Sequence, residues 1–180
     1  FLDLQKAEAQ AREAKIEAAL ERVRAASMAM HKSEELAEVI LSIDKEISTL
    51  NINIDNSSII TDFHDLKTGL NNWIAVKGRK FLQKFYIPYS NDHPLIKRMK
   101  RAIKKGEHYY VEQYSKSEKN TYFNWLFKYS DFRNLPDDRK EYVLAREGWT
   151  RVLIFSKNSL LIFQRLDCRC FTNEEVEIFK

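Results

Sequence analysis

The sequence has 180 residues, of which 44% are hydrophobic and 12% aromatic, so the chain can bury a core and global disorder is excluded. Its 30 basic and 26 acidic residues leave a formal net charge of +4 at pH 7. Because the two signs are mixed along the chain, it lacks the concentrated basic field typical of nucleic-acid-binding proteins, and we expect no nucleic-acid partner.

The first part of the chain predicts a long helix. Residues 5–26 are dominated by Ala, Glu, Lys, Arg and Gln, and no Gly or Pro occurs before Gly69. Apolar side chains recur mainly at heptad spacing, which is typical of a helix that packs along another helix. This seam consists of Leu2, Ala9, Ile16, Leu20, Val23 and Met30. We predict a homodimer in which two such helices pair in parallel; the alternative is a helix that lies on its own domain.

A second helix is predicted to follow a joint near His31 to Ser33. Ser33 is a suitable N-cap, and acidic residues follow it in the first turn. A new apolar stripe then begins at Leu36 and continues to Leu50 in a different register. We therefore expect two parts, a coiled-coil helix over residues 1–32 and a domain over residues 33–180.

The remainder predicts an α+β domain with about six strands. Six short runs are rich in β-branched and aromatic residues. They are residues 58–63, 71–76, 81–89, 108–114, 149–155 and 160–165. The first three predict an antiparallel meander, and residues 156–159 predict a hairpin turn between the last two.

Capping signals predict the helices between and after these strands. Pro94 and Gly106 mark the start and end of one helix, whose opposite face carries six basic residues. Ser115 and Glu118 have capping-box spacing before a second helix. Pro136 begins a third, and Thr172 begins a last one that runs to the end of the sequence. We interpret the basic face as a solvated surface, with a phosphate or acidic partner as the alternative.

The helix that follows Ser115 has an aromatic arc wider than a helix on a sheet needs, so we expect its surplus aromatic surface to meet another helix, a ligand or a partner chain. Aromatic faces supply much contact area at little entropic cost. We expect a small, largely apolar or aromatic ligand, contacted by some of Trp73, Tyr110, Tyr122, Trp125 and Trp149. Ordinary core packing of these side chains is the alternative.

No catalytic or metal-binding pattern emerges from the titratable residues. The histidines His31, His64, His93 and His108 are scattered without ligand spacing, and we interpret His93 before Pro94 as part of a helix cap. We expect no hydrolase, transferase or kinase activity.

The cysteines and the hydropathy pattern favour a cytoplasmic protein. A disulfide between Cys168 and Cys170 would be strained, and a structural or incidental role is favoured over metal binding or redox chemistry. No apolar run approaches the roughly 20 residues needed to span a bilayer, so direct membrane insertion is not expected.

Three segments resemble one family of signalling proteins. Residues 11–39 (AREAKIEAALERVRAASMAMHKSEELAEV) resemble the helical segment that precedes a GAF-like domain in multidomain sensor proteins of Bacteroidetes-type bacteria. Residues 85–107 (FYIPYSNDHPLIKRMKRAIKKGE) and 146–165 (REGWTRVLIFSKNSLLIFQR) resemble the domain itself. The resemblance implies a GAF-like fold, with an antiparallel sheet of about six strands flanked by helices, a long N-terminal coiled-coil helix, and a pocket between the sheet and the helices over one face.

The resemblance also implies a role in signal transduction. Members of this family commonly lie upstream of histidine kinase or nucleotide cyclase domains, including those of two-component systems. The ending FTNEEVEIFK resembles a lead into a helix like the one that begins this chain, as in tandem modules. Together with Phe1 in place of Met, this leads us to expect a piece of a larger receptor, whose adjoining signalling domains are partners in the same chain.

The implied ligand remains unidentified. The Asn-Lys-Phe-Asp-Glu signature of relatives that bind cyclic nucleotides is missing, and the Cys of bilin-binding relatives has no match in Cys168 or Cys170. No cofactor can therefore be assigned. Two hypotheses stay open: a ligand-responsive, non-catalytic sensor, and a ligand-free dimerisation and structural relay module.

Overall fold

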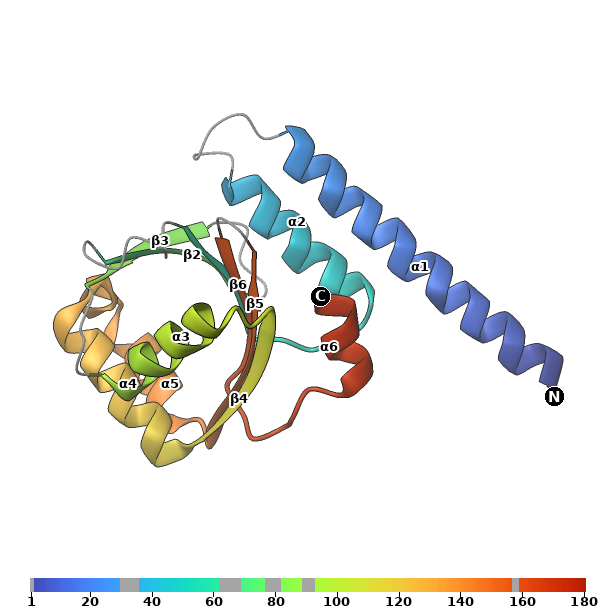
Figure 1. Ribbon diagram of the computed structural model, residues 1–180. Helices are drawn as coiled ribbons and strands as arrows, with labels where there is room; N and C mark the ends of the chain where they lie inside the picture. The colour runs from blue at the N-terminus through green and yellow to red at the C-terminus, as the bar shows by residue number, and fades with distance from the viewer. Residues whose placement is uncertain (1, 30–35, 62–68, 77–81, 89–92, 157–158) are drawn as a thin grey trace. The chain divides into compact units, whose positions relative to one another are not determined.

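The computed structural model describes residues 2–29, 36–61, 69–76, 82–88, 93–156 and 159–180 (Figure 1). The chain divides into two compact units, Phe1–Asn53 and Ile54–Lys180. The predicted joint near His31 to Ser33 lies outside the described residues, so the proposed division at residue 32 stays a prediction.

The first unit contains two helices, α1 (Leu2–Ala29) and α2 (Leu36–Thr49). The long N-terminal helix is therefore confirmed. Arg22 of α1 donates from Nε and Nη2 to the carboxylate oxygens of Glu46 on α2, at 2.8 and 2.6 Å. The hydrogen bonds from Arg22 lower the pKa of Glu46, against the opposing effect of its burial. Within this unit α1 and α2 are thus joined by a bidentate ion pair.

The predicted seam on α1 is only partly covered. Ile16 and Val23 are half-buried, whereas Ala9 and Leu20 are exposed. Ala19, which the heptad pattern does not include, is the buried residue of this helix. The side chain of Leu2 and the whole of Met30 lie outside the described part. Pairing with a second copy stays a prediction.

In the second unit, six strands among the described residues form one antiparallel sheet in the order β3-β2-β1-β6-β5-β4. This confirms the predicted number of strands, the meander of the first three and the α+β class. The strands are β1 (Asn56–Thr61), β2 (Leu70–Val76), β3 (Leu82–Ile87), β4 (Tyr109–Ser115), β5 (Gly148–Phe155) and β6 (Ser159–Arg165).

Strand β1 begins two residues earlier than predicted. Asn56 pairs with Val76 on one side and with Gln164 on the other. A prediction based on β-branched and aromatic residues gives little weight to the polar residues Asn56 and Ser57, which come before Ile59 and Ile60. The shift matters because Asn56 reaches the cavity described below.

The predicted helices of this unit begin where their capping signals place them, although the helix expected to end near Gly148 ends at Ala145. They are α3 (Pro94–Lys105), α4 (Lys116–Tyr129), a short 3-10 helix η2 (Asp131–Asn134), α5 (Asp137–Ala145) and α6 (Asn173–Phe179). His93 caps α3, because its Nδ1 accepts from the Leu95 amide at 3.2 Å, and Gly106 ends this helix with φ of 68°. The predicted capping box at Ser115 is present, and Thr172, which was predicted only to begin the last helix, forms a second one.

Figure 1 shows α3, α4 and α5 over one face of the sheet, which we call the inner face, and α6 on the other. On the outer face, Phe163 of β6 stacks on Phe179 of α6 with ring centroids 4.2 Å apart. Arg165 also reaches Glu175 of α6 at 2.5 Å. Because side chains alternate between faces along a strand, every second residue points toward the helices of the inner face.

Candidate ligand-binding site

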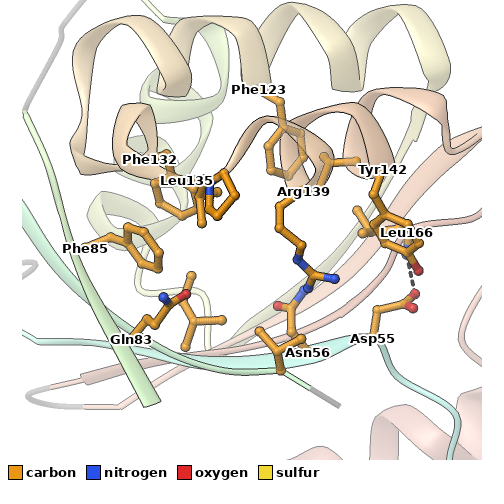
Figure 2. Close-up of a pocket in the computed structure, with 14 residues that line it drawn as sticks. Asp55, Asn56, Gln83, Phe85, Phe123, Phe132, Leu135, Arg139, Tyr142 and Leu166 are labelled. Atoms are coloured by element: carbon orange, nitrogen blue, oxygen red, sulfur yellow. Dashed lines mark hydrogen bonds between the residues drawn. The ribbon is translucent and has the colours of Figure 1, made fainter. Parts of the chain in front are cut away.

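A cavity of about 330 Å³ lies between the inner face of the sheet and the segment formed by η2 and α5 (Figure 2). This volume falls at the lower end of the roughly 300–1,000 Å³ usual for small-molecule sites. Ten of its lining residues are apolar or aromatic: Ile74, Val76, Phe85, Phe123, Phe132, Leu135, Pro136, Tyr142, Val143 and Leu166. The other four are Asp55, Asn56, Gln83 and Arg139. The composition is that of a site for a small molecule with an apolar body and a few polar groups.

Arg139 is the cationic group of this cavity. Its side chain extends from α5 toward the sheet in Figure 2, and its guanidinium lies 5.4 Å from the centroid of the Tyr142 ring. Within the described part of the chain the guanidinium makes no hydrogen bond and no ion pair. A half-buried cation in a largely apolar space is therefore left to solvent or to a ligand.

The amide of Asn56 is held in one orientation by a chain of two hydrogen bonds. Trp149 Nε1 donates to Gln164 Oε1 at 2.8 Å, and Gln164 Nε2 donates to Asn56 Oδ1 at 2.8 Å. Because the indole N–H can only donate, the Gln164 oxygen must face it, and the Asn56 oxygen must then face Gln164. The NH₂ group of Asn56 consequently is turned away from Gln164 and has no hydrogen-bond partner among the described residues.

Asp55 occupies the end of the cavity near β6. Its Oδ2 accepts a hydrogen bond from the Leu166 amide at 2.7 Å, the dashed line in Figure 2. This contact ties the start of β1 to the segment that follows β6. No ion pair joins Asp55 to Arg139 among the described residues, although both line the same space.

The cavity adjoins two smaller hollows. An outer one of about 290 Å³ shares Gln83, Phe85, Leu135 and Pro136 with it and lies between β3 and η2. An inner one of about 70 Å³ reaches Tyr122 and Trp149 under α4. The outer hollow offers a route from the surface beside the edge strand β3.

Four of the five aromatic residues predicted to bind a ligand come together on the inner face, away from this cavity. Tyr122 stacks on Trp149 with ring centroids 5.4 Å apart, and on Trp125 at 6.0 Å. Tyr110 stacks on Phe155 at 5.6 Å. Tyr122 and Trp149 reach the inner hollow, and none of the four lines the larger cavity. We call Tyr110, Tyr114, Tyr122, Phe123, Trp125 and Trp149 the aromatic cluster.

The fifth residue, Trp73, lies on the other face of the sheet. Its neighbours along β2, Asn72 and Ile74, reach the inner hollow, so alternation directs Trp73 outward. There it contacts Lys84, whose Nζ lies 5.0 Å from the ring centroid. The expectation that Trp73 shares a pocket with the other four is thus corrected, since a strand buried on both faces gives no sign of which one faces the helices.

A buried ion pair, missed in the sequence, lies within the aromatic cluster. Arg151 of β5 and Glu112 of β4 are cross-strand partners, with Nε and Oε2 2.5 Å apart. Burial opposes the charge of Arg151, but Glu112 and the nearby tyrosines Tyr114, Tyr110 and Tyr122 together outweigh it, so the pKa of Arg151 is raised. Burial and the positive charge of Arg151 lower the pKa of nearby His93. The sequence does contain a signal for this buried charge, because alternation along β4 puts Glu112 on the same face as Tyr110 and Tyr114.

Lys119 joins α4 to the end of α5. This fully buried side chain donates to the Val143 and Leu144 carbonyls and to Asn120 Oδ1. Carbonyls at a helix C-terminus attract a cation, which explains why a lysine is found there. Burial lowers the pKa of Lys119 to about 8. The contact fixes the helix that carries Arg139.

The remaining candidates stay on the surface. The basic face of α3 is largely exposed, with Arg98 3.4 Å from Glu112 and Lys105 4.0 Å from Glu107. Cys168 and Cys170 are exposed free thiols. A search of the described residues finds no cluster of three potential metal ligands. None of the described helices combines the length and apolar character needed to cross a bilayer.

Arg139 could have been singled out from the sequence. Leu135, Tyr142 and Val143 lie four residues before it and three and four residues after it, which is the spacing of one helical face. A charged residue on an otherwise apolar stripe indicates either a buried pair or a site. No comparable signal identifies Asn56, whose partner Gln164 is 108 positions away in the sequence.

Comparisons with known proteins add no relative. No model of a known protein family matches the sequence, and no curated protein matches it.

Proposed function

We propose that the chain is a non-catalytic, cytoplasmic sensory or relay module of a bacterial signal-transduction receptor, with a GAF-like domain. In this proposal the domain binds a small ligand and passes the signal through the helices of a homodimer. The intact receptor carries further signalling domains, such as a histidine kinase or a nucleotide cyclase. The proposal rests on the resemblance of residues 11–39, 85–107 and 146–165 to such proteins and on the cavity.

The cavity is the observation that carries the ligand hypothesis. It lies between the inner face and the helices, where the resemblance implies a pocket. Inside its apolar walls are the Arg139 guanidinium and the Asn56 NH₂ group, which have no hydrogen-bond partner among the described residues. A protein that evolved only to pack would fill such a space, because empty volume in a core is destabilising. Occupation by a small molecule accounts for both features.

A ligand screen on the whole 180-residue protein tests the hypothesis. Native mass spectrometry and thermal shift against a panel of charged and neutral metabolites are expected to identify a compound that binds one per chain and raises the melting temperature. Leu135→Trp, which fills the cavity, should abolish binding. Leu153→Trp lies away from the cavity and controls for destabilisation. A hit that L135W leaves unchanged would place the ligand elsewhere.

The proposed dimer depends on the seam of α1. Replacement of Ile16, Leu20 and Val23 by Glu puts charges into the seam and should yield monomers in light scattering. A matched control places three Glu residues on the exposed opposite side, at Ala14, Ala18 and Ala25. The control should remain dimeric. Dimers that survive the seam substitution would refute the coiled coil.

The alternative is a ligand-free dimerisation and relay module. It is favoured by the tight stacking of the aromatic cluster, which fills the part of the inner face where a ligand was expected. If this alternative is correct, the screen gives no specific hit while the seam substitution still produces monomers. The two experiments therefore separate the two functions.

A further inference from the structure

We propose that the cavity is selective for a small monocarboxylate with an apolar or aromatic body, held by Arg139 and Asn56. This inference rests on the proposed function, since it specifies the chemistry of the ligand that the cavity would bind. Nothing in the resemblance names such a compound. The argument comes from the charges and hydrogen-bond donors of the cavity walls.

Arg139 supplies the positive charge. Its guanidinium enters the cavity from α5 and has neither a carboxylate nor a carbonyl partner in the described chain. A planar guanidinium matches the two oxygens of a carboxylate in a bidentate hydrogen bond, which is stronger than a neutral one. The apolar surroundings strengthen the attraction further, because they lower the local dielectric.

Asn56 supplies a second donor with a fixed direction. The bonds from Trp149 to Gln164 and from Gln164 to Asn56 commit the Asn56 oxygen, so only its NH₂ group is available to a ligand. In Figure 2 the Asn56 side chain rises from the sheet on the side toward which Arg139 extends. One polar end of the cavity thus presents donors from both the helix and the sheet, which suits an acceptor with at least two oxygens.

The charge of Asp55 favours a monoanion. This carboxylate lines the same cavity, and its bond with the Leu166 amide does not neutralise it. The guanidinium of Arg139 and the carboxylate of Asp55 leave the cavity walls without net charge. The Asp55 carboxylate therefore repels a dianionic phosphate more strongly than it repels a singly charged carboxylate. The ring faces of Phe85, Phe123 and Phe132 complete the site on its apolar side.

Isothermal titration calorimetry on the 180-residue protein tests the inference with matched pairs of probes. The pairs are phenylacetate and phenylacetamide, indole-3-acetate and indole-3-acetamide, and hexanoate and hexanamide; phenyl phosphate is added as a dianion. Each carboxylate is expected to bind at least about tenfold more tightly than its amide, the loss expected for one charge-assisted contact. Phenyl phosphate should bind more weakly than phenylacetate.

Arg139→Gln should remove the preference for the acid over the amide, whereas Arg133→Gln should keep it. Arg133 is an exposed arginine of η2 that does not line the cavity, so its variant controls for the loss of one charge. Because the Arg139 side chain makes no hydrogen bond within the described chain, R139Q is expected to fold, and its thermal unfolding checks this. Equal affinity for acid and amide, or a preference that survives R139Q, would overturn the inference while the proposed ligand function stands. If carboxylates fail to bind but a neutral compound from the screen binds, only the inference fails. If neither class binds, both fail.

Discussion

The two halves of the inner face differ in how completely they are filled. Under α4, the aromatic cluster and the pair of Glu112 and Arg151 leave a hollow of only about 70 Å³. Under η2 and α5, a cavity of about 330 Å³ remains. Both halves are built on the same sheet, so the strands alone do not explain the contrast.

The two halves also differ in whether their charged side chains find partners of opposite charge. In the aromatic cluster, Trp149 contacts Tyr114, Tyr122 and Phe123, and the charge of Arg151 is matched by Glu112. In the cavity, Arg139 has no such partner in the described chain. The charged groups of the filled half are therefore paired with one another, whereas the guanidinium that lines the cavity is not.

The largest expected effect comes from the buried ion pair. Arg151→Met leaves the buried carboxylate of Glu112 with Arg98 as its cationic partner in the described chain, so we expect the free energy of unfolding to fall by about 3 kcal/mol, measured by urea denaturation. Arg98→Met is the matched control. Because the Arg98 side chain is 55% exposed, this variant should lose less than about 1 kcal/mol. Equal effects of the two variants would show that Arg151 does not anchor the filled half.

A matched pair of substitutions compares packing in the two halves. Leu153→Phe enlarges a fully buried side chain of β5 and should lower the free energy of unfolding by about 1–3 kcal/mol. Leu135→Phe adds the same atoms at the cavity wall and should change it by less than about 1 kcal/mol. Urea denaturation of both variants measures the contrast. Similar losses would mean that the cavity is no more accommodating than the filled half.

Lys119, which joins α4 of the filled half to α5 of the other half, should make the free energy of unfolding depend on pH. The folded pKa of Lys119, about 8, lies below the roughly 10.4 expected for an unfolded lysine. Between these values the unfolded chain binds more protons, so the free energy of unfolding rises with pH, by roughly 1–2 kcal/mol between pH 8 and 9.5. Lys119→Met should lack this rise. A wild-type stability that stays flat or falls across this range would contradict the assignment.

Local signals predicted much of the fold. His93, Gly106 and the capping boxes at Ser115 and Thr172 are short-range features, and the structure has all of them. The composition of each strand is also a short-range feature, and it predicted the six strands. The beginning of β1 was misplaced because Asn56 is polar and belongs to the sheet only through its partners on β2 and β6.

The binding site was predicted less well than the fold. The aromatic arc of α4 led to Tyr122 and Trp125, but periodicity cannot distinguish side chains that face a cavity from those that stack on one another. Trp73 was assigned to the wrong face of the sheet because the sequence pattern does not fix the phase of β2. A change of phase by one residue moves every side chain of a strand to the opposite face. Contacts such as that between Asn56 and Gln164 depend on the complete sheet.

Nuclear magnetic resonance of the isotopically labelled 180-residue protein tests most directly whether the cavity is the ligand site. During titration with the tightest-binding carboxylate, we expect the largest chemical-shift changes at the backbone amides of Asn56, Phe85 and Arg139. The indole N–H of Trp149 should shift as well, through its hydrogen-bond chain to Asn56. The amides of Tyr110 and Glu112, on β4, should change little. Saturable binding with the largest changes on β4 and none around Arg139 would contradict the account.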